Sequence, residues 1–332
     1  MFSSRFVMAL MLPDSLALGE KASYGKVPDI SPPFTRIDQT FTSQGLKCGA
    51  WLYLPEGVKK PPVVVMAHGF GGQRWMWLPA YAERFAQRGM AVFVFDYRCF
   101  NDSEGQPRNY INPKRHLQDW KAALAYVRTL DEVDTRRIAL WGTSFSGEHV
   151  IRTAADDKGI KAVVAQVPFT DGITTDLSYV SQPVFACKAL YHGLADVIAA
   201  AFTRHRYNVQ IAGKPGEAFG MMSTPDAMPG LLKLLGIPEE EWSPHNYCPA
   251  DIVFTLGLYR PITWAKKVAC PALIIGAEQD SLFPPDGPQK MASIMQKATY
   301  IGVPVGHFDV YVDDAFEKLV TRMGDFLQTN LR

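Results

Sequence analysis

The sequence ALWGTSFSGEH, residues 139–149, joins an apolar run to a cluster of small residues and then to a helical pattern. The apolar run is typical of a buried strand, and Gly142 stands two residues before Ser144. A sharp turn from a strand into a helix strains the backbone of its apex residue, so its neighbours must be small and its side chain is exposed. We therefore expect Ser144 to be displayed for chemistry.

Short apolar runs on both sides of this turn alternate with helical patterns. The strand-like runs cover residues 63–70, 90–97, 137–142 and 160–169, and the helical patterns lie at 78–89 and 116–130. Runs that are apolar throughout are typical of strands covered on both faces. Strands that alternate with helices form a parallel sheet between two helical layers. The predicted fold class is therefore α/β, with a mostly parallel central sheet and helices on both faces.

The pattern changes at both ends of this region. Residues 34–54 alternate apolar and polar side chains around Gln44 and Gly45, which predicts an antiparallel hairpin. Residues 173–260 carry apolar helical segments without a comparable strand, which is typical of a helical insertion. The predicted division is an N-terminal strap at 1–33, a core at 34–172 and 261–332, and a helical lid at 173–260.

Composition favours small-molecule chemistry. The chain has 332 residues, of which 47% are hydrophobic and 20% charged, so it can bury a large core. A formal net charge of +1 offers no basic surface for nucleic acid. We expect a small-molecule substrate and no membrane span. The oligomeric state is left open, with a homodimer among the options.

Five cysteines form neither a CxxC pair nor a metal-binding spacing with histidine. Their odd number argues against a disulfide framework and indicates a reducing, cytoplasmic compartment. The alternative is export, if the apolar run at 6–12 belongs to a signal peptide. The run GFGGQR, residues 69–74, lacks the third glycine of a dinucleotide-binding loop. We therefore expect neither a cofactor nor a metal.

A serine nucleophile needs a base and a carboxylate that orients the base. His307 lies in VPVGHFD, immediately after the last predicted strand, and Asp280 directly ends the strand before it. In open α/β sheets ligands bind at the carboxyl ends of the strands, where Ser144, Asp280 and His307 all fall. Asp171 in VPFTDG is the alternative acid. We favour Asp280 because the interval to His307 leaves room for one helix and one strand.

This order of Ser144, Asp280 and His307, with HGFGG at 68–72, resembles the serine α/β-hydrolase superfamily. The likeness covers residues 34–172 and 261–330. Within the superfamily, GTSFSG together with GHFD resembles dienelactone-hydrolase-like esterases and the fungal polyketide-transferase-type hydrolases.

Two residues depart from the pattern of that superfamily. Ser146 stands where the G-x-S-x-G motif has its last glycine, and Glu148 stands where relatives often have another glycine. Because serine is small, we expect the turn to form.

The resemblance implies a role for each residue. Ser144 would attack the acyl carbon, His307 would transfer its proton, and Asp280 would orient His307. The backbone N–H groups of Phe70 and Phe145 would form the oxyanion hole.

Trp75 and Trp77 follow the HGFGG loop directly. They are either ordinary core residues or part of the wall of an acyl or alcohol pocket, and we assign them to substrate binding. The apolar segments of the predicted lid favour a hydrophobic substrate.

The sequence therefore predicts a carboxylic ester hydrolase that acts on a hydrophobic small molecule through an acyl-enzyme on Ser144. The first alternative is a thioesterase or acyltransferase that works on a bulky acyl chain. A peptidase and a catalytically silent binding module are less favoured, because no acidic pair is evident in the lid and neither the turn nor the triad is broken.

Overall fold

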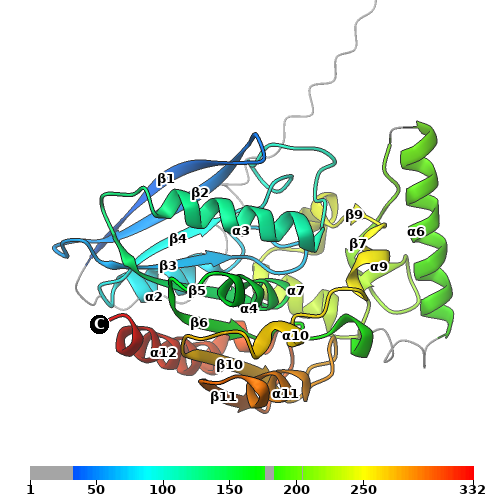
Figure 1. The fold of residues 1–332 in the computed structure, drawn as a ribbon. Helices are drawn as coiled ribbons and strands as arrows, with labels where there is room; N and C mark the ends of the chain where they lie inside the picture. The colour runs from blue at the N-terminus through cyan, green and yellow to red at the C-terminus, as the bar shows by residue number, and fades with distance from the viewer. Residues whose placement is uncertain (1–32, 176–182, 204) are drawn as a thin grey trace, which may run out of the picture.

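Eight strands lie side by side in one central sheet (Figure 1). The computed structural model describes residues 33–175, 183–203 and 205–332. Across the sheet the order is β1-β2-β4-β3-β5-β6-β10-β11. The strands span Phe34–Ser43 (β1), Leu46–Pro55 (β2), Pro62–Ala67 (β3), Ala91–Phe95 (β4), Asp134–Thr143 (β5), Ile160–Gln166 (β6), Ala272–Ala277 (β10) and Ala298–Val303 (β11). All neighbours from β4 to β11 are parallel, so the predicted mostly parallel α/β sheet is confirmed.

The two strands at the other edge of the sheet form the predicted antiparallel hairpin. Ser43 pairs with Leu46, so only Gln44 and Gly45 make the turn. Their φ angles are 50° and 80°. A two-residue hairpin turn of this kind needs positive φ at both central positions, which Gly45 adopts without steric cost.

Helices cover both faces of the sheet (Figure 1). On one face lie α2 (Leu78–Ala86) and α12 (Asp313–Asn330), and on the other lie α3 (Pro113–Val127), α4 (Phe145–Asp156), α10 (Ile262–Ala265) and α11 (Gly287–Ile294). A short 3₁₀ turn, η2 (Asp309–Tyr311), precedes α12. The central strands are apolar throughout because helices cover both of their sides, and Val63, Val64 and Val65 have no exposed surface.

Helix α3 begins earlier than its apolar pattern indicates. The Asn112 side chain accepts a hydrogen bond of 3.1 Å from the backbone N–H of Arg115, and Pro113 occupies the first helical position. Asparagine at the N-cap and proline directly after it are the preferred start of a helix. The capping residues therefore set the start, three residues before the predicted position 116.

The stretch predicted as a helical insertion, residues 173–260, also contains strands. Its described elements are α6 (Pro183–Thr203), β7 (Asn208–Ala212), β8 (Gly220–Met222), α7 (Ala227–Leu235), α8 (Glu239–Trp242), η1 (Ser243–His245), β9 (Cys248–Pro249) and α9 (Ile252–Leu256). The three strands pair in the order β8-β7-β9. Strands β7, β8 and β9 have only five, three and two residues, too few to show an alternating pattern in the sequence. The predicted helical insertion is therefore corrected to a mostly helical one with a small three-stranded sheet, and its role as a lid remains a prediction.

Helix α6 differs from the other helices in its surroundings. It stands at the side of the molecule, and an 18-residue window within it has a mean hydropathy of 1.4 with only 11% of its residues buried (Figure 1). By length and composition it is the one helix among the described residues that could cross a bilayer. The core helices of many proteins pass the same test, so this is weak evidence for a span.

The predicted N-terminal strap lies, apart from Pro33, outside the described residues. The same holds for the apolar run at 6–12, on which the alternative of export rests.

Candidate active site

Ser144 lies at the sharp turn between β5 and α4. Its φ and ψ angles are 53° and −120°, a strained conformation for a residue with a side chain. Its backbone N–H donates to the Gln166 carbonyl at 2.9 Å, which ties the turn to β6. A Cβ at Gly142 would overlap the Ser146 carbonyl, so only glycine fits there. Ser146 is accommodated, and its Oγ accepts a 3.0 Å hydrogen bond from the Tyr97 hydroxyl.

His307 and Asp280 meet Ser144 at the carboxyl edge of the sheet. His307 Nε2 lies 3.2 Å from Ser144 Oγ, and His307 Nδ1 lies 2.7 Å from Asp280 Oδ2. The His307 side chain is buried. Asp280 Oδ1 accepts the backbone N–H groups of Leu282 at 2.9 Å and Phe283 at 3.1 Å. The carboxylate therefore has a fixed orientation and still offers its second oxygen to the histidine.

Asp171, the alternative acid, has a different partner. Its two carboxylate oxygens accept hydrogen bonds of 2.8 and 2.9 Å from the Arg260 guanidinium. Arg260 lies two residues before α10, so this ion pair ties the end of the insertion to the core. The structure therefore places Asp280, and not Asp171, beside His307.

The loop after β3 packs directly against the serine turn. A Cβ at Gly69 would lie 3.0 Å from the Cβ of Ser144, so glycine is needed for this approach. The rings of Phe70 and Phe145 pack edge to face with centroids 5.5 Å apart. Phe145 is also the first residue of α4, where backbone N–H groups have no partner within the helix. The residues expected to supply the oxyanion hole thus lie side by side next to Ser144.

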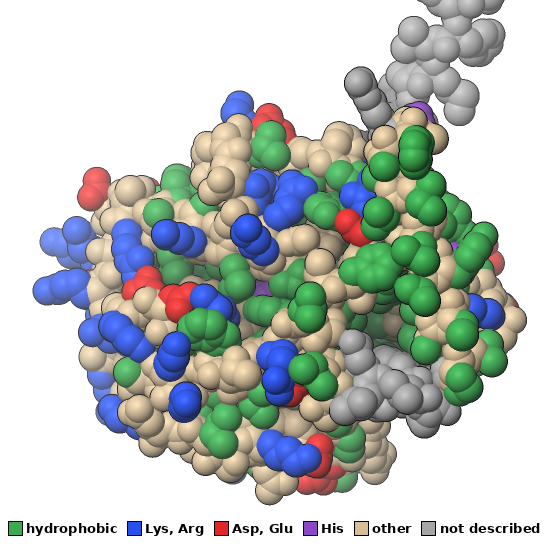
Figure 2. All heavy atoms as spheres, turned by 45° about the vertical axis from the view of Figure 1, so that its right-hand side comes forward, with side chains coloured by type: hydrophobic (Ala, Val, Ile, Leu, Met, Phe, Trp, Pro, Cys, Tyr) green, Lys and Arg blue, Asp and Glu red, His purple; other side chains and the backbone are tan. Residues whose placement is uncertain are grey.

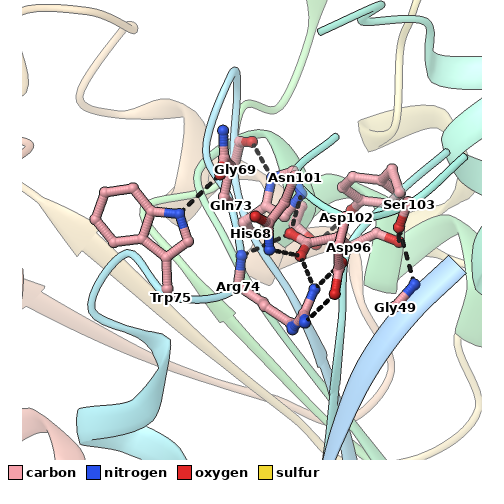
Figure 3. Close-up of polar contacts among 12 residues, drawn as sticks. Gly49, His68, Gly69, Gln73, Arg74, Trp75, Asp96, Asn101, Asp102 and Ser103 are labelled. Atoms are coloured by element: carbon pink, nitrogen blue, oxygen red, sulfur yellow. Dashed lines mark hydrogen bonds and ion pairs between the residues drawn. The ribbon is translucent and has the colours of Figure 1, made fainter. Parts of the chain in front are cut away.

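A buried ionic network holds this loop in place (Figure 3). Asp96, which has no exposed surface, accepts the backbone N–H of Arg74 at 2.6 Å and a hydrogen bond from its guanidinium. Arg74 also donates two hydrogen bonds to Asp102, and Asn101 Nδ2 donates to Asp96 at 2.9 Å. His68 Nε2 lies 3.4 Å from the Asp96 carboxylate, and His68 Nδ1 lies 3.0 Å from the Gly69 carbonyl oxygen. The network therefore links both ends of the loop at residues 68–74 to the residues that follow β4.

We expect Asp96→Ala to lower the free energy of unfolding by about 3–5 kcal/mol, because it removes the fully buried carboxylate that Arg74, Asn101 and His68 all contact. Asp102→Ala is the matched control. The Asp102 side chain is 52% exposed, so its loss should cost about 1 kcal/mol or less. Urea denaturation of both variants measures the difference. Equal losses in the two variants would contradict the assignment of Asp96 as the anchor.

An apolar cavity of about 310 Å³ opens beside the serine turn. Among the described residues, Thr175 is the only polar one in its lining. That lining consists of Phe70, Phe145, Phe169, Thr175, Phe185, Ala186, Ala189, Leu190, Met221, Met222, Val253, Phe254, Leu256, Leu282 and Phe283. Phe283 also packs edge to face on His307, with centroids 5.3 Å apart. Cavities of this size and character hold small apolar ligands.

Trp75 and Trp77 do not belong to this cavity. Both are buried in the core, and neither lines the cavity. The Trp75 indole N–H donates to Gln73 Oε1 at 2.7 Å, and the Trp77 ring packs on Phe316 of α12. The expected substrate-binding role is therefore corrected to a packing role, because the chain turns these side chains inward.

A second buried polar cluster joins α3, α4 and Tyr259, and no sequence pattern indicates it. His149 Nδ1 lies 2.9 Å from the Tyr259 hydroxyl, and His149 Nε2 lies 3.2 Å from His116 Nδ1. The His116 ring stacks on Tyr97 at 3.9 Å. Burial lowers the pKa of His149 to about 3, so the imidazole is neutral. This cluster joins α3 and α4 to the segment that enters α10.

Glu148 faces neither the cavity nor solvent. Its side chain has no exposed surface, and neither carboxyl oxygen has a hydrogen-bond partner among the described residues. Burial raises the pKa of Glu148 well above its ordinary value, which favours the neutral acid.

Among the described residues no group of three or more His, Cys, Asp or Glu side chains is arranged to hold a metal ion.

The chain is similar to known proteins in both sequence and structure. Residues 62–314 match the alpha/beta hydrolase fold family. The chain is 40% identical over 296 residues to the quorum-quenching protein AidA of Acinetobacter baumannii, covering 89% of this chain and 95% of the relative. It is 26% identical over 295 residues to a thiohydrolase of Eupenicillium brefeldianum, covering 86% and 92%.

Among solved structures, the alpha/beta hydrolase GrgF from Penicillium superimposes with a TM-score of 0.74. The two sequences are 23% identical, and the superposition covers 90% of this chain and 99% of GrgF. At this identity the likeness concerns the fold alone. With the family match over most of the chain and the 40% identical relative, the chain belongs to the α/β-hydrolase fold family.

Proposed function

We propose that this protein is a serine hydrolase that cleaves a carboxylic ester, or a related acyl bond, of a hydrophobic small molecule. The observation that carries the proposal is the contact of His307 with both Ser144 and Asp280, at 3.2 and 2.7 Å, beside an apolar cavity. A serine hydroxyl becomes an effective nucleophile when a neutral imidazole accepts its proton and a carboxylate holds that imidazole.

In the proposed first step, Ser144 Oγ attacks the acyl carbon while His307 Nε2 takes its proton. Asp280 accepts the Nδ1 proton of His307, which leaves Nε2 free as the base and stabilises the imidazolium that forms. The negative charge on the substrate oxygen meets the backbone N–H groups of Phe70 and Phe145. His307 then protonates the leaving group, and an acyl-enzyme on Ser144 remains.

In the second step, His307 removes a proton from water while the water oxygen attacks the acyl carbon. His307 then returns this proton to Ser144 Oγ as the bond between Oγ and the acyl carbon breaks and the acid leaves. The same geometry serves an alcohol or a thiol as acceptor, in which case the product is a new ester or thioester. The second candidate is therefore an acyltransferase or, when the leaving group of the first step is a thiol, a thioesterase. The names thiohydrolase and polyketide transferase among the relatives favour this candidate.

The insertion supplies much of the cavity wall and is proposed to act as a lid over Ser144. Phe185 and Ala189 come from α6, and Met221 and Met222 come from β8. A dry, apolar cover excludes water from the acyl-enzyme and favours an apolar acyl group.

We expect kcat/KM for p-nitrophenyl esters to rise from acetate to butyrate to octanoate. Each methylene that enters the cavity contributes about 0.8 kcal/mol, or about fourfold per carbon, until the cavity is filled. Initial rates of p-nitrophenol release from the three esters give kcat/KM for each chain length. Ala189→Trp narrows the cavity and should remove the preference for octanoate without lowering acetate turnover. A flat profile in the wild-type protein would contradict an apolar acyl site.

A parallel assay separates the two candidates. Matched octanoyl esters and octanoyl thioesters are compared, with and without an added alcohol as acceptor. Preferential hydrolysis of the oxygen ester supports the first candidate, whereas faster thioester cleavage or accumulation of the transesterified product supports the second.

A further inference from the structure

The outer side of α6 is apolar and faces away from the core. Val184, Tyr191 and Ile198 are 69%, 65% and 57% exposed. Figure 2 shows hydrophobic side chains gathered on this side of the molecule. Globular proteins rarely expose an apolar patch of several hundred Å² unless another surface covers it.

The outward residues of α6 repeat with a heptad spacing. Intervals of three and four residues alternate along the series Val184, Cys187, Tyr191, Leu194, Ile198 and Ala201, all of which are exposed. We call these six residues the α6 stripe. An average repeat of 3.5 residues lets one helix pack along another over several turns. The stripe therefore fits a partner helix.

The opposite side of α6 packs against the rest of the insertion. A Cβ at Gly193 would collide with Val253 and Phe254, so α6 and α9 are in close contact. The buried Asp196 accepts a 2.7 Å hydrogen bond from Arg206 Nε. The α6 stripe therefore faces outward and is not covered by any other described part of the chain.

We propose that the α6 stripe packs antiparallel against the α6 stripe of a second copy of this chain, related by a twofold axis. A twofold contact needs a surface that complements itself, and an apolar stripe without charges does so. Besides the buried Asp196, the helix carries one charged residue, Lys188. Helices that lie on lipid have a strongly charged polar face, which α6 lacks. A second copy is therefore the occupant that the charges favour.

The exposed area matches what a dimer needs. Apart from Leu190, which lines the cavity, six large apolar side chains are exposed on α6. At about 100 Å² each they offer about 600 Å² per copy and about 1,200 Å² for the pair, at the lower end of the range of specific interfaces.

The antiparallel direction sets specific pairs. Opposed helix dipoles favour it, and it brings Tyr191 of one copy to Leu194 of the other and Cys187 to Ile198. On its inner side the same helix lines the cavity with Phe185, Ala186 and Ala189. The second copy would thus support the wall of the cavity from outside.

The test is the mass of the full-length protein in solution. Size-exclusion chromatography with light scattering is expected to give about twice 36.9 kDa for the wild type. The double variant Leu194→Asp, Ile198→Asp places two carboxylates in the stripe and should halve the mass. Ile294→Asp is the matched control, because Ile294 is an exposed apolar residue on α11 and its replacement should leave the dimer intact.

A monomeric wild type, or a dimer that persists in the double variant, would overturn the proposal. A monomer that floats with phosphatidylcholine vesicles would assign the stripe to lipid and overturn it equally. Circular dichroism of each variant verifies that the fold is kept.

A second experiment uses a variant that keeps the α6 stripe nearly as apolar as in the wild type. Ile198→Cys should give a covalent dimer after oxidation with diamide, through Cys187 of the second copy. Adding Cys187→Ser to that variant should abolish the cross-link. Failure of Ile198→Cys to cross-link would overturn the antiparallel pairing.

Discussion

Replacing Ser144 with alanine is expected to lower kcat for p-nitrophenyl butyrate by about 10⁶-fold, the effect of removing a nucleophile that works with a base as one unit. The small residual rate would come from binding and from the backbone donors of Phe70 and Phe145. The variant should fold, since alanine fits wherever the serine side chain does. Steady-state hydrolysis and circular dichroism together measure this.

A covalent label gives an independent readout of the same residue. A fluorophosphonate should add once to the wild-type protein, as seen by intact mass, and not to Ser144→Ala. Ser293→Ala is the matched control, because Ser293 is exposed on α11 and its loss should change neither labelling nor turnover. An adduct that persists in Ser144→Ala would show that another residue is the nucleophile.

Asp280→Asn is expected to lower kcat by about 10⁴-fold while the protein stays folded. The amide that replaces the carboxylate can donate to His307 Nδ1, which favours the tautomer that carries its proton on Nε2 and cannot act as base. Asp171→Asn should leave kcat within a few-fold of the wild type, because Asp171 pairs with Arg260 and not with His307. Steady-state kinetics of the two variants under identical conditions makes the comparison.

The reverse result, with Asp171→Asn inactive and Asp280→Asn active, would mean that the acid changes partner in the working enzyme. A large loss in both variants together with a lowered midpoint of urea unfolding would point to stability and not to chemistry.

The serine turn and its partners could be predicted because their signals are local. Small residues around Ser144 and a polar residue directly after a strand identify positions that the backbone itself fixes. Once the sheet is parallel, the ends of β10 and β11 meet the turn after β5 at one edge. The geometry of Ser144, Asp280 and His307 therefore followed from the order of strands.

Other features depend on packing between distant segments and left no such signal. Trp75 and Trp77 adjoin the candidate site in sequence, yet the turn before α2 directs them into the core. His116 and His149 come together only because α3 packs on α4. The short strands β7, β8 and β9 are stabilised by pairing with one another, and no alternating pattern in the sequence marks them.

The attachment of Asp280 bears on how the substrate range of this protein can be altered. The two residues whose N–H groups hold its carboxylate, Leu282 and Phe283, also form part of the cavity wall. Enlarging the cavity at these two positions would disturb the acid together with the wall, so selectivity and turnover would change as one. Met221 and Ala189 line the cavity from the insertion and lie outside this linkage. Redesign for larger acyl groups is best begun at Met221 and Ala189, where binding can be varied and the proposed proton relay is left unchanged.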